Sequence, residues 1–566
     1  MTVSSLARWL PFLKWPRPDA ELLRGEFWAG MTVGLMLVPQ GVAYAALAGM
    51  PLVTGIYASL LPALVAVLWG SSSRLSVGPT ALTSLLIGAS LTGLAEPGSA
   101  QWVALAAWMA LLTGALQLLL GLVRFGWLLN LVTSPVLSGF TQAAALLILA
   151  SQLPALTGLR VPLAELAATP GVQHFDLLGA GMGLGSIAAL VLAKRFWPGF
   201  PAVIVVMGAA ALASRALGYE AGGGAVVGAL PAGLPQPYWP GALPWGTLGA
   251  LIMPVLVITL VSFLETASSA KVEHQEGGTR WNENQDLIAQ GLAKISSGLC
   301  GSFTTSSSFS RSAINLYAGA RTGWATLFAC ALVLVALLWL TPALHHVPQS
   351  VLAAVVVTAI TGLIKPALLP QLWRISRVEA TIGALTFVVT LAAAPNLYWG
   401  VLAGLVVNLS HFLYQRLHPR IIEVGLHPDG SLRDRHLWHL PPLAPRLLAL
   451  RMDAELDFAS ASALERTLSE RMADFPRLAH VCLFAQPINR IDVTGVETFA
   501  RLMALVQRQG CTLHISGLKL PVETALRRAG ELQESPQLKM YRTDTEALQA
   551  LRQLDPLPPD MAAAAI

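Results

Sequence analysis

The sequence has few charged residues. Asp, Glu, Lys and Arg make up only 12% of its 566 residues, whereas 54% of the residues are hydrophobic and the mean hydropathy is +0.61. Soluble domains contain about one quarter charged residues, so this composition excludes an ordinary soluble protein and indicates an integral membrane protein with a smaller soluble part. The formal net charge of +5 is small and distributed over many loops, and it does not indicate a nucleic-acid partner.

Cysteine is also rare, and the sequence has no nucleotide-binding loop. The four cysteines show no metal-ligand spacing and are expected to be free thiols: Cys300, Cys330, Cys482 and Cys511. Because the pattern GxxxxGK[ST] is absent, a transport function would take its energy from gradients rather than from ATP. We find no catalytic constellation, so we expect neither enzymatic activity nor a metal or cofactor.

Between about residues 25 and 420 the sequence is a series of apolar runs. A helix that crosses the hydrocarbon core of a membrane needs about 20 residues. Runs of that length are 101–122, 130–152, 175–194, 199–217, 249–270, 323–341 and 376–393. Shorter or interrupted runs are 28–48, 52–69, 77–93, 284–300, 306–320, 349–364 and 396–415. Lys and Arg are concentrated in alternate loops, so fourteen spans with both termini in the cytoplasm satisfy the positive-inside rule.

The segment 301–322 interrupts the apolar pattern at its most polar point. Seven serine and threonine residues precede Arg311 in this segment, and the preceding run 257–270 contains a single carboxylate, Glu265. Hydrocarbon does not tolerate exposed backbone or an unpaired guanidinium, so such a segment must line a cavity enclosed by protein. We interpret it as a broken helix whose second part begins facing a substrate.

The two halves of the apolar region resemble each other. The first half has Val38-Pro39-Gln40-Gly41 and, two spans later, Ser76-Val77-Gly78-Pro79-Thr80-Ala81. The second half has Glu265 and, two spans later, the segment 306–311. Seven spans per half place the halves in opposite orientations, and interrupted segments at matching positions of inverted repeats indicate a transporter's binding site. The N-termini of half-helices favour an anion.

The last 120 or so residues have the composition of a soluble domain. Segment 421–446 is mostly polar and rich in proline, and we interpret it as a linker. Beyond it, apolar strands alternate with helical patterns and predict a compact α/β domain over 447–555. We expect strands at 447–456, 480–486 and 512–518, and helices at 460–473, 494–508, 521–530 and 544–554. Residues 556–566 are interpreted as a disordered tail.

Several motifs, in order along the chain, resemble the SulP (sulfate permease) family of anion transporters, whose animal members include pendrin and prestin. In the membrane part they are 34–45 (GLMLVPQGVAYA), 55–59 (GIYAS), 76–79 (SVGP) and 308–313 (SFSRSA). In the soluble part, 455–459 (ELDFA) and 491–495 (IDVTG) resemble a STAS domain. The resemblance covers nearly all of residues 20–550.

The resemblance implies a fold and a mode of action. The fold is an all-α polytopic membrane domain over 25–420, with fourteen spans in a seven-plus-seven inverted repeat, preceded by a cytoplasmic segment, 1–24, and followed by the small cytoplasmic α/β STAS domain. Spans 1–4 and 8–11 would form a core domain that moves like an elevator against a gate domain of spans 5–7 and 12–14. A homodimer in the inner (plasma) membrane, in contact with lipid, is also implied.

The resemblance places the substrate between the facing ends of spans 3 and 10. The expected substrate-binding residues are Gln40, Tyr44, Gly78, Pro79, Thr80, Ser308, Phe309, Ser310 and Arg311. Arg311 would supply positive charge to an anion site; the alternative is an arginine that only stabilises packing.

Glu265 is the expected site of the coupling ion, with a proton favoured over sodium. The alternative for Glu265 is a static salt bridge to Arg311. Lys294 is interpreted as a snorkelling residue, and His345 and His346 as solvated loop residues. Thr494 occupies the position at which related anti-sigma-factor antagonists are phosphorylated, but a threonine at a helix start is also an ordinary N-cap.

Together these features predict a secondary active transporter of a small anion, sulfate by default, driven by a proton gradient. The alternatives on substrate are bicarbonate and C4-dicarboxylates such as fumarate or succinate. An uncoupled anion channel is a second class of function, and a sensor that only presents its STAS domain is a third. The nearly complete set of site motifs argues against the sensor.

Overall fold

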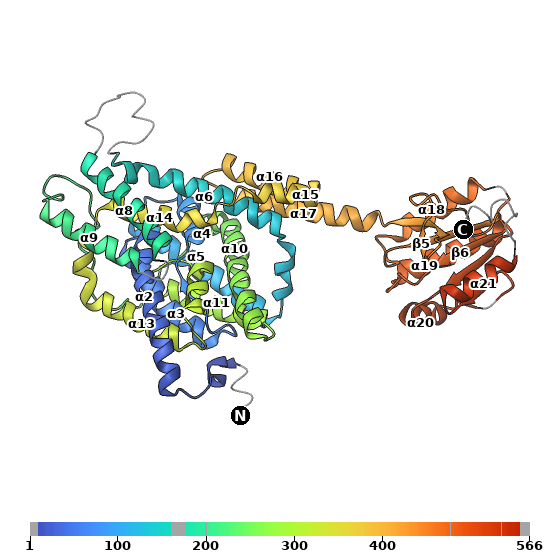
Figure 1. Cartoon of the computed structure of the whole chain (residues 1–566), viewed down its shortest axis with the longest axis horizontal. Helices are drawn as coiled ribbons and strands as arrows, with labels where there is room; N and C mark the ends of the chain where they lie inside the picture. The colour runs from blue at the N-terminus through green and yellow to red at the C-terminus, as the bar shows by residue number, and fades with distance from the viewer. Residues whose placement is uncertain (1–8, 160–175, 198–200, 476, 534, 555–566) are drawn as a thin grey trace, which may run out of the picture. The chain divides into compact units, whose positions relative to one another are not determined.

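The computed structural model describes residues 9–159, 176–197, 201–475, 477–533 and 535–554. The chain divides into two compact units, Met1–Asn408 and Leu409–Ile566 (Figure 1). The first is almost entirely helical, and the second is built on a six-stranded sheet. The membrane part and the α/β part expected from composition therefore correspond to separate units.

The helices of the first half of the membrane unit follow the predicted apolar runs. They are α2 (Ala20–Leu47), α3 (Val53–Trp69), α4 (Ala81–Leu91), α5 (Ala100–Leu122), α6 (Ser134–Thr157), α8 (Leu177–Phe196) and α9 (Ala202–Ala216). A short 3-10 turn, Pro11–Lys14, precedes α2. The chain between α3 and α4 forms the two-residue strand β1 (Val77–Gly78).

The second half repeats this order. Its helices are α10 (Trp245–Gly277), α11 (Glu283–Gly298), α12 (Phe309–Tyr317), α13 (Trp324–Val335), α14 (Gln349–Ile360), α15 (Leu368–Ile375), α16 (Arg377–Ala392) and α17 (Tyr398–Leu417). The strand β2 (Ser306–Ser307) precedes α12 at the position that β1 has before α4. Each of the fourteen predicted runs overlaps one of these helices, and α15 is an additional short helix with no predicted counterpart.

Seven helical segments in the described part of the chain are long and apolar enough to cross a membrane. The helices α4 and α12 are much shorter, and they are the two that follow β1 and β2. A helix of this length cannot span the hydrocarbon core alone. The interruptions recognised in the sequence are therefore real breaks in the helical structure.

Glycines allow two pairs of helices to cross closely. A Cβ atom at Gly55 on α3 would lie 1.9 Å from the carbonyl oxygen of Gly41 on α2, and a Cβ at Gly291 on α11 would lie 2.7 Å from that of Gly114 on α5. Small residues at helix interfaces permit such close backbone contact. The first crossing fixes the part of α2 that carries Gln40, and the second holds α11 against α5 (Figure 1).

A buried carboxylate also connects the two halves. Glu26 near the start of α2 accepts hydrogen bonds from the backbone N–H groups of Arg321, Thr322 and Ala325, at 2.7, 2.8 and 2.9 Å. These groups lie at the start of α13, where the helix dipole favours negative charge. Glu26 is only 1% exposed, so this contact anchors α2 to α13 from within the protein.

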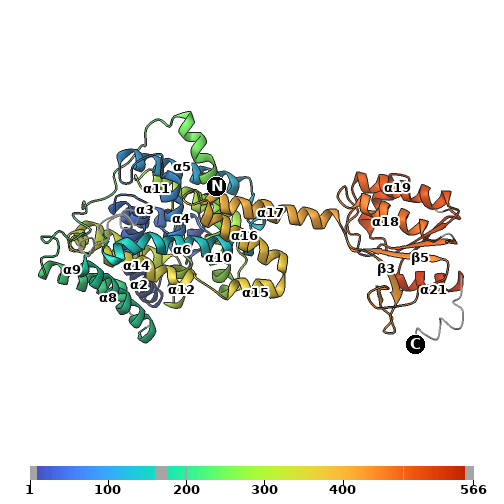
Figure 2. The same ribbon diagram turned by 90° about the horizontal axis from the view of Figure 1, so that it is seen from above.

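The C-terminal unit is a mixed sheet covered on both faces. Its strand order is β4-β3-β5-β6-β7-β8, in which β5 to β8 are parallel and β3 and β4 are antiparallel to their neighbours. Helices α18 (Ala461–Ala473) and α19 (Val493–Arg508) cover one face, and α21 (Asp544–Leu554) covers the other (Figure 2). The remaining elements are β5 (Leu447–Met452), β6 (His480–Phe484), β7 (Thr512–Ser516), β8 (Leu538–Tyr541) and α20 (Leu520–Arg528).

The three predicted strands and four predicted helices of this unit are confirmed, but the linker is wrong. Segment 421–446 contains β3 (Ile421–Leu426) and β4 (Leu432–Asp434), and β3 pairs with β5 as part of the sheet. The buried carboxylate of Glu423 on β3 is paired with Arg435 and His436, so this charged residue belongs to the folded unit rather than to a linker. The expected tail 556–566 lies outside the described residues, as do residues 1–8 of the N-terminal segment.

Candidate functional site

The two broken helices meet through a short antiparallel ladder. β1 pairs with β2, with Val77 opposite Ser307 and Gly78 opposite Ser306. The backbone N–H of Ser308 extends the ladder by donating to the carbonyl oxygen of Ser76 at 3.0 Å. Since each strand leads directly into a half-helix, the ladder places the start of α4 next to the start of α12.

Each half-helix begins with a hydroxyl cap. Thr80 is the N-cap of α4 and Ser308 is the N-cap of α12, and each side chain accepts from the backbone N–H three residues later. The remaining N–H groups in the first turn of a helix have no intrahelical acceptor, and the positive end of the dipole lies there. Two such ends side by side place unpaired N–H groups and positive dipole ends together, which suits an anion.

Arg311 connects the two halves of this site. Its guanidinium is 1% exposed and donates from Nε to the hydroxyl of Ser76 at 3.2 Å, from Nη1 to Gln40 Oε1 at 3.1 Å and from Nη2 to the carbonyl oxygen of Pro79 at 3.0 Å. All three acceptors belong to the first repeat, although Arg311 belongs to the second. The guanidinium therefore joins the repeats while its charge stays beside the half-helix starts.

The contact with Arg311 also orients Gln40. A guanidinium has only donors, so it fixes Gln40 Oε1 toward itself and directs the amide NH₂ elsewhere, where it can donate to an anion. Tyr44 lies one helical turn further along α2 and is 6% exposed. The two residues thus occupy the same side of α2, as the sequence spacing predicted.

The remaining predicted ligands differ in exposure. Gly78, Pro79 and Thr80 are buried where β1 leads into α4, whereas Phe309 is 54% exposed and Ser310 is exposed beside it. A Cβ on Gly78 would lie 3.4 Å from Arg311 Nη2, so this position borders the guanidinium directly. The structure therefore brings the predicted residues together around α4 and α12, with Phe309 and Ser310 on the open side of the site.

The side chain of Glu265 on α10 also lies at the start of α4. Thr80 Oγ1 donates to Glu265 Oε2 at 3.0 Å, and the same hydroxyl lies 2.9 Å from Thr83 Oγ1. The alternative of a salt bridge to Arg311 is wrong, since no ion pair within 4.0 Å joins Glu265 to Arg311 in the described structure. The carboxylate is instead hydrogen-bonded to the residue that caps α4, and it is half-buried rather than fully enclosed.

The interpretation of Lys294 on α11 as a snorkelling residue is wrong. The residue is 0% exposed, so it does not snorkel to a membrane surface, and its Nζ has no hydrogen-bond partner in the described part of the protein. Lys294 lies near enough to Glu265 for a charge on one group to act on the other. The physical reason is that α11 packs against both α5 and α3, so the face that carries Lys294 points into the protein.

A hydrogen-bond network around residues 71–74, just before β1, was not recognised from the sequence. The carboxylate of Asp286 on α11 accepts from the backbone N–H of Ser71 at 2.7 Å and from the hydroxyl of Ser72 at 2.5 Å. Arg74 is bound to Glu273 at the end of α10 at 3.3 Å. These contacts hold the loop that leads into β1. The only sequence feature that could have indicated them is the run of three serines at 71–73.

Two other predicted features do not join the site. His345 and His346 are not simply solvated, because both contact Glu220. In the C-terminal unit Thr494 is exposed and is not the N-cap of α19; the cap is Asp492, whose carboxylate accepts from the N–H of Gly495 at 2.8 Å. The hydroxyl of Thr494 therefore has no capping role.

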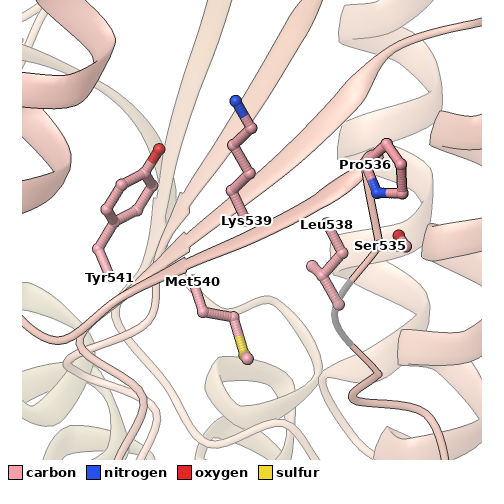
Figure 3. Close-up of a pocket in the computed structure, with 6 residues that line it drawn as sticks. All are labelled: Ser535, Pro536, Leu538, Lys539, Met540 and Tyr541. Carbon is pink, nitrogen blue, oxygen red and sulfur yellow. The ribbon is translucent and has the colours of Figure 1, made fainter.

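A surface cavity of about 520 Å³ lies in the C-terminal unit along the edge strand β8 (Figure 3). Lys539 and Tyr541 point to one side of the strand and Leu538 and Met540 to the other, as strand alternation requires. The cavity has one cationic side chain and shares no residue with the half-helix site. It is therefore not the candidate anion site.

Comparisons with known proteins agree with this geometry. Residues 23–386 match the sulfate permease family and residues 442–547 match the STAS domain. A probable sulfate transporter of Mycobacterium tuberculosis is 31% identical over 96% of this chain and 98% of its own length. A sodium-independent sulfate anion transporter of Bos taurus is 30% identical over 92% of this chain and 88% of its own.

The fold is also similar to a solved structure, that of the murine Solute Carrier 26 family member A9 anion transporter in the inward-facing state. The two have a TM-score of 0.88 at 19% identity, over 98% of this chain and 95% of that one. The family match covers well over half of the chain, and the relatives are named as transporters rather than enzymes. The chain belongs to the sulfate permease family of membrane anion transporters and carries a C-terminal STAS domain.

Proposed function

We propose that the protein is a secondary active transporter of a small dianion, with sulfate as its substrate, driven by protons. The observation that supports this most directly is the pairing of β1 with β2, which places two half-helix starts and the guanidinium of Arg311 together. Helix N-termini and a desolvated guanidinium are both suited to oxyanions. The relatives named as sulfate transporters support the choice of sulfate.

The substrate would sit against the starts of α4 and α12. The backbone N–H groups of Ala81 and Phe309 are at the first helical positions, and the amide NH₂ of Gln40 and the hydroxyl of Tyr44 are further donors. The exposed Phe309 and Ser310 would border the entrance. Arg311 would act mainly through its charge, since three of its N–H groups already have acceptors in the protein.

Glu265 would carry the coupling proton. Its hydrogen bond with Thr80 connects the carboxylate to the cap of α4, so a change in its charge acts at the helix start that faces the anion. Protonation removes a negative charge from beside the substrate, and proton and anion binding should therefore strengthen each other by the same factor. The bovine relative named as sodium-independent supports a proton rather than sodium.

Transport would follow an elevator-type movement in which spans 1–4 and 8–11 carry the site past spans 5–7 and 12–14. This division keeps β1, β2, Glu265 and Lys294 within one moving body. The proposal further includes a homodimer embedded in the lipid of the inner (plasma) membrane, with both termini in the cytoplasm, consistent with the distribution of Lys and Arg in the loops.

Uptake into proteoliposomes tests this function. Liposomes containing the purified full-length protein are given labelled sulfate with and without an inward proton gradient, and parallel samples receive labelled bicarbonate or fumarate. We expect saturable sulfate accumulation that requires the gradient. Faster accumulation of one of the other anions would reassign the substrate, and unitary currents without accumulation would identify a channel.

A further inference from the structure

Three side chains from two loops of the membrane unit meet outside the anion site. Glu220 follows α9, and His345 and His346 precede α14. His345 Nε2 lies 3.2 Å from each carboxylate oxygen of Glu220, and His346 Nδ1 lies 3.2 Å from Glu220 Oε2. The candidate ligand atoms all lie within 4.8 Å of one another, and the three side chains are partly exposed.

Backbone hydrogen bonds hold the two loops together. The N–H of Val227 donates to the carbonyl of Val347 at 2.9 Å, and the N–H of Gly228 donates to the carbonyl of His345 itself at 3.0 Å. On the other side of Glu220, the neighbouring Tyr219 is buried and its hydroxyl donates to Asp176 at 2.6 Å. The backbone around Glu220 and the two histidines is thus held by hydrogen bonds both before and after Glu220.

The donor set fits a borderline divalent cation. Zinc is bound by imidazole nitrogen and carboxylate oxygen at about 2.0–2.2 Å in tetrahedral geometry, which places neighbouring ligand atoms about 3.3 Å apart. The observed nitrogen–oxygen distances of 3.2 Å are close to this value. Calcium and magnesium prefer oxygen ligands, and two imidazoles among three ligands disfavour them.

We propose that Glu220, His345 and His346 form a binding site for Zn²⁺ that restrains transport when it is occupied. Each ring nitrogen that faces Glu220 would give up its hydrogen bond and ligate the metal as neutral imidazole, leaving a fourth position for water. Under the proposed function, the Glu220 loop joins the seventh span to the eighth and the histidine loop joins the eleventh to the twelfth. Each loop connects the moving body to the other spans. A metal bound by both loops would therefore oppose displacement of the moving body relative to those spans.

Calorimetric titration of the full-length protein with ZnCl₂ tests the site. The purification tag is removed and the protein is first treated with EDTA. We expect one zinc ion per chain, with affinity reduced at least about tenfold in the double variant His345→Asn/His346→Asn and in Glu220→Gln. His439→Asn, at an exposed histidine of the other unit, is the matched control and should bind as the wild type does. Equal affinity in the wild type and the double variant would overturn the proposed site.

Anion flux in proteoliposomes tests the restraint, which rests on the proposed function. Zinc on the side of the loops should slow flux reversibly, EDTA should restore it, and the double variant should be insensitive. Zinc that binds at one per chain without slowing an active transporter would overturn the restraint while the site stands. A protein that transports no anion refutes the proposed function instead, and calorimetry still decides whether the site exists.

Discussion

Arg311 Nη1 on α12 and Gln40 Oε1 on α2 lie 3.1 Å apart, although they are 271 positions apart in the sequence. The same guanidinium reaches Ser76 and Pro79 in the first repeat. One side chain thus joins the two repeats where the half-helices meet, and under the proposed function it also supplies charge to the substrate site. These two contributions can be separated by substitutions that remove the contacts but keep the charge.

Arg311→Ala and Arg311→Lys make that separation. Alanine removes the charge and leaves three buried acceptors unsatisfied, and each lost contact with a charged group costs about 1.5–3 kcal/mol. Lysine keeps the charge but cannot donate to all three acceptors in the planar arrangement of the guanidinium. We expect alanine to lower both the melting temperature and the affinity for sulfate, and lysine to retain more affinity than alanine. Thermal unfolding and the concentration dependence of uptake measure the two effects. Wild-type affinity in a stable Arg311→Ala protein would show that the charge does not act on the substrate.

Glu265→Gln mimics the protonated carboxyl group. Its amide oxygen can still accept from Thr80, so the cap of α4 should persist and sulfate should still exchange across the membrane. Accumulation driven by a pH gradient should be lost, because glutamine cannot take up or release a proton. Counterflow and gradient-driven uptake are compared in the same liposomes, with Glu379→Gln, an exposed carboxylate on α16, as the control. Gradient-driven accumulation by Glu265→Gln would exclude Glu265 as the coupling group.

The sequence predicted the membrane part of the fold well because its signals are local. Apolar runs, the proline of Val38-Pro39-Gln40 and the run of hydroxyl residues before Arg311 each report a property of their own segment. The inverted halves followed from repeated motifs and an odd number of spans. The same local signals missed β3, because a six-residue strand with a charged residue in its middle, Glu423, resembles a polar loop.

Contacts between segments far apart in the sequence could not be predicted. The partners of Arg311 depend on the pairing of β1 with β2, and no property of either strand specifies the other. The burial of Lys294 depends on which helices cover α11, and a single lysine in an apolar run is equally consistent with snorkelling. The contact of His345 with Glu220 depends in the same way on two loops joined by backbone hydrogen bonds.

His514 makes the stability of the C-terminal unit depend on pH. It is buried on β7, with its ring nitrogens 3.1 Å from the hydroxyl of Tyr541 and 3.2 Å from His480. Burial, and then the positive charges of His480 and Lys539, lowers the pKa of His514 to about 4 from an unfolded value of about 6.5. The unfolded chain therefore binds a proton between these values and the folded chain does not, so stability is full above pH 6.5 and falls as the pH drops toward 4.

Urea unfolding of a fragment spanning 409–566, which is a compact unit with its own core, measures this effect. The expected loss between pH 7 and pH 4 is on the order of 3 kcal/mol for a shift of this size. His514→Gln should remove most of the pH dependence in this interval, whereas the exposed control His439→Gln should not. An unchanged slope in His514→Gln would assign the effect to other groups.

Lys294 gives the prediction in which stability and activity should change in opposite directions. The amino group of Lys294 is buried and has no hydrogen-bond partner among the described residues, which is unfavourable by on the order of several kcal/mol for a charged group, so Lys294→Met should unfold at the same or a higher temperature than the wild type. Under the proposed function, losing this group from beside Glu265 should alter the proton affinity of the proposed coupling carboxylate and slow gradient-driven uptake. Lys271→Met, at an exposed lysine on α10, controls for the loss of one positive charge. The two measurements are the melting temperature and the pH dependence of sulfate uptake. A destabilised Lys294→Met protein would mean that the lysine is needed for packing, and a stable variant with wild-type uptake at every pH would mean that its charge has no part in transport.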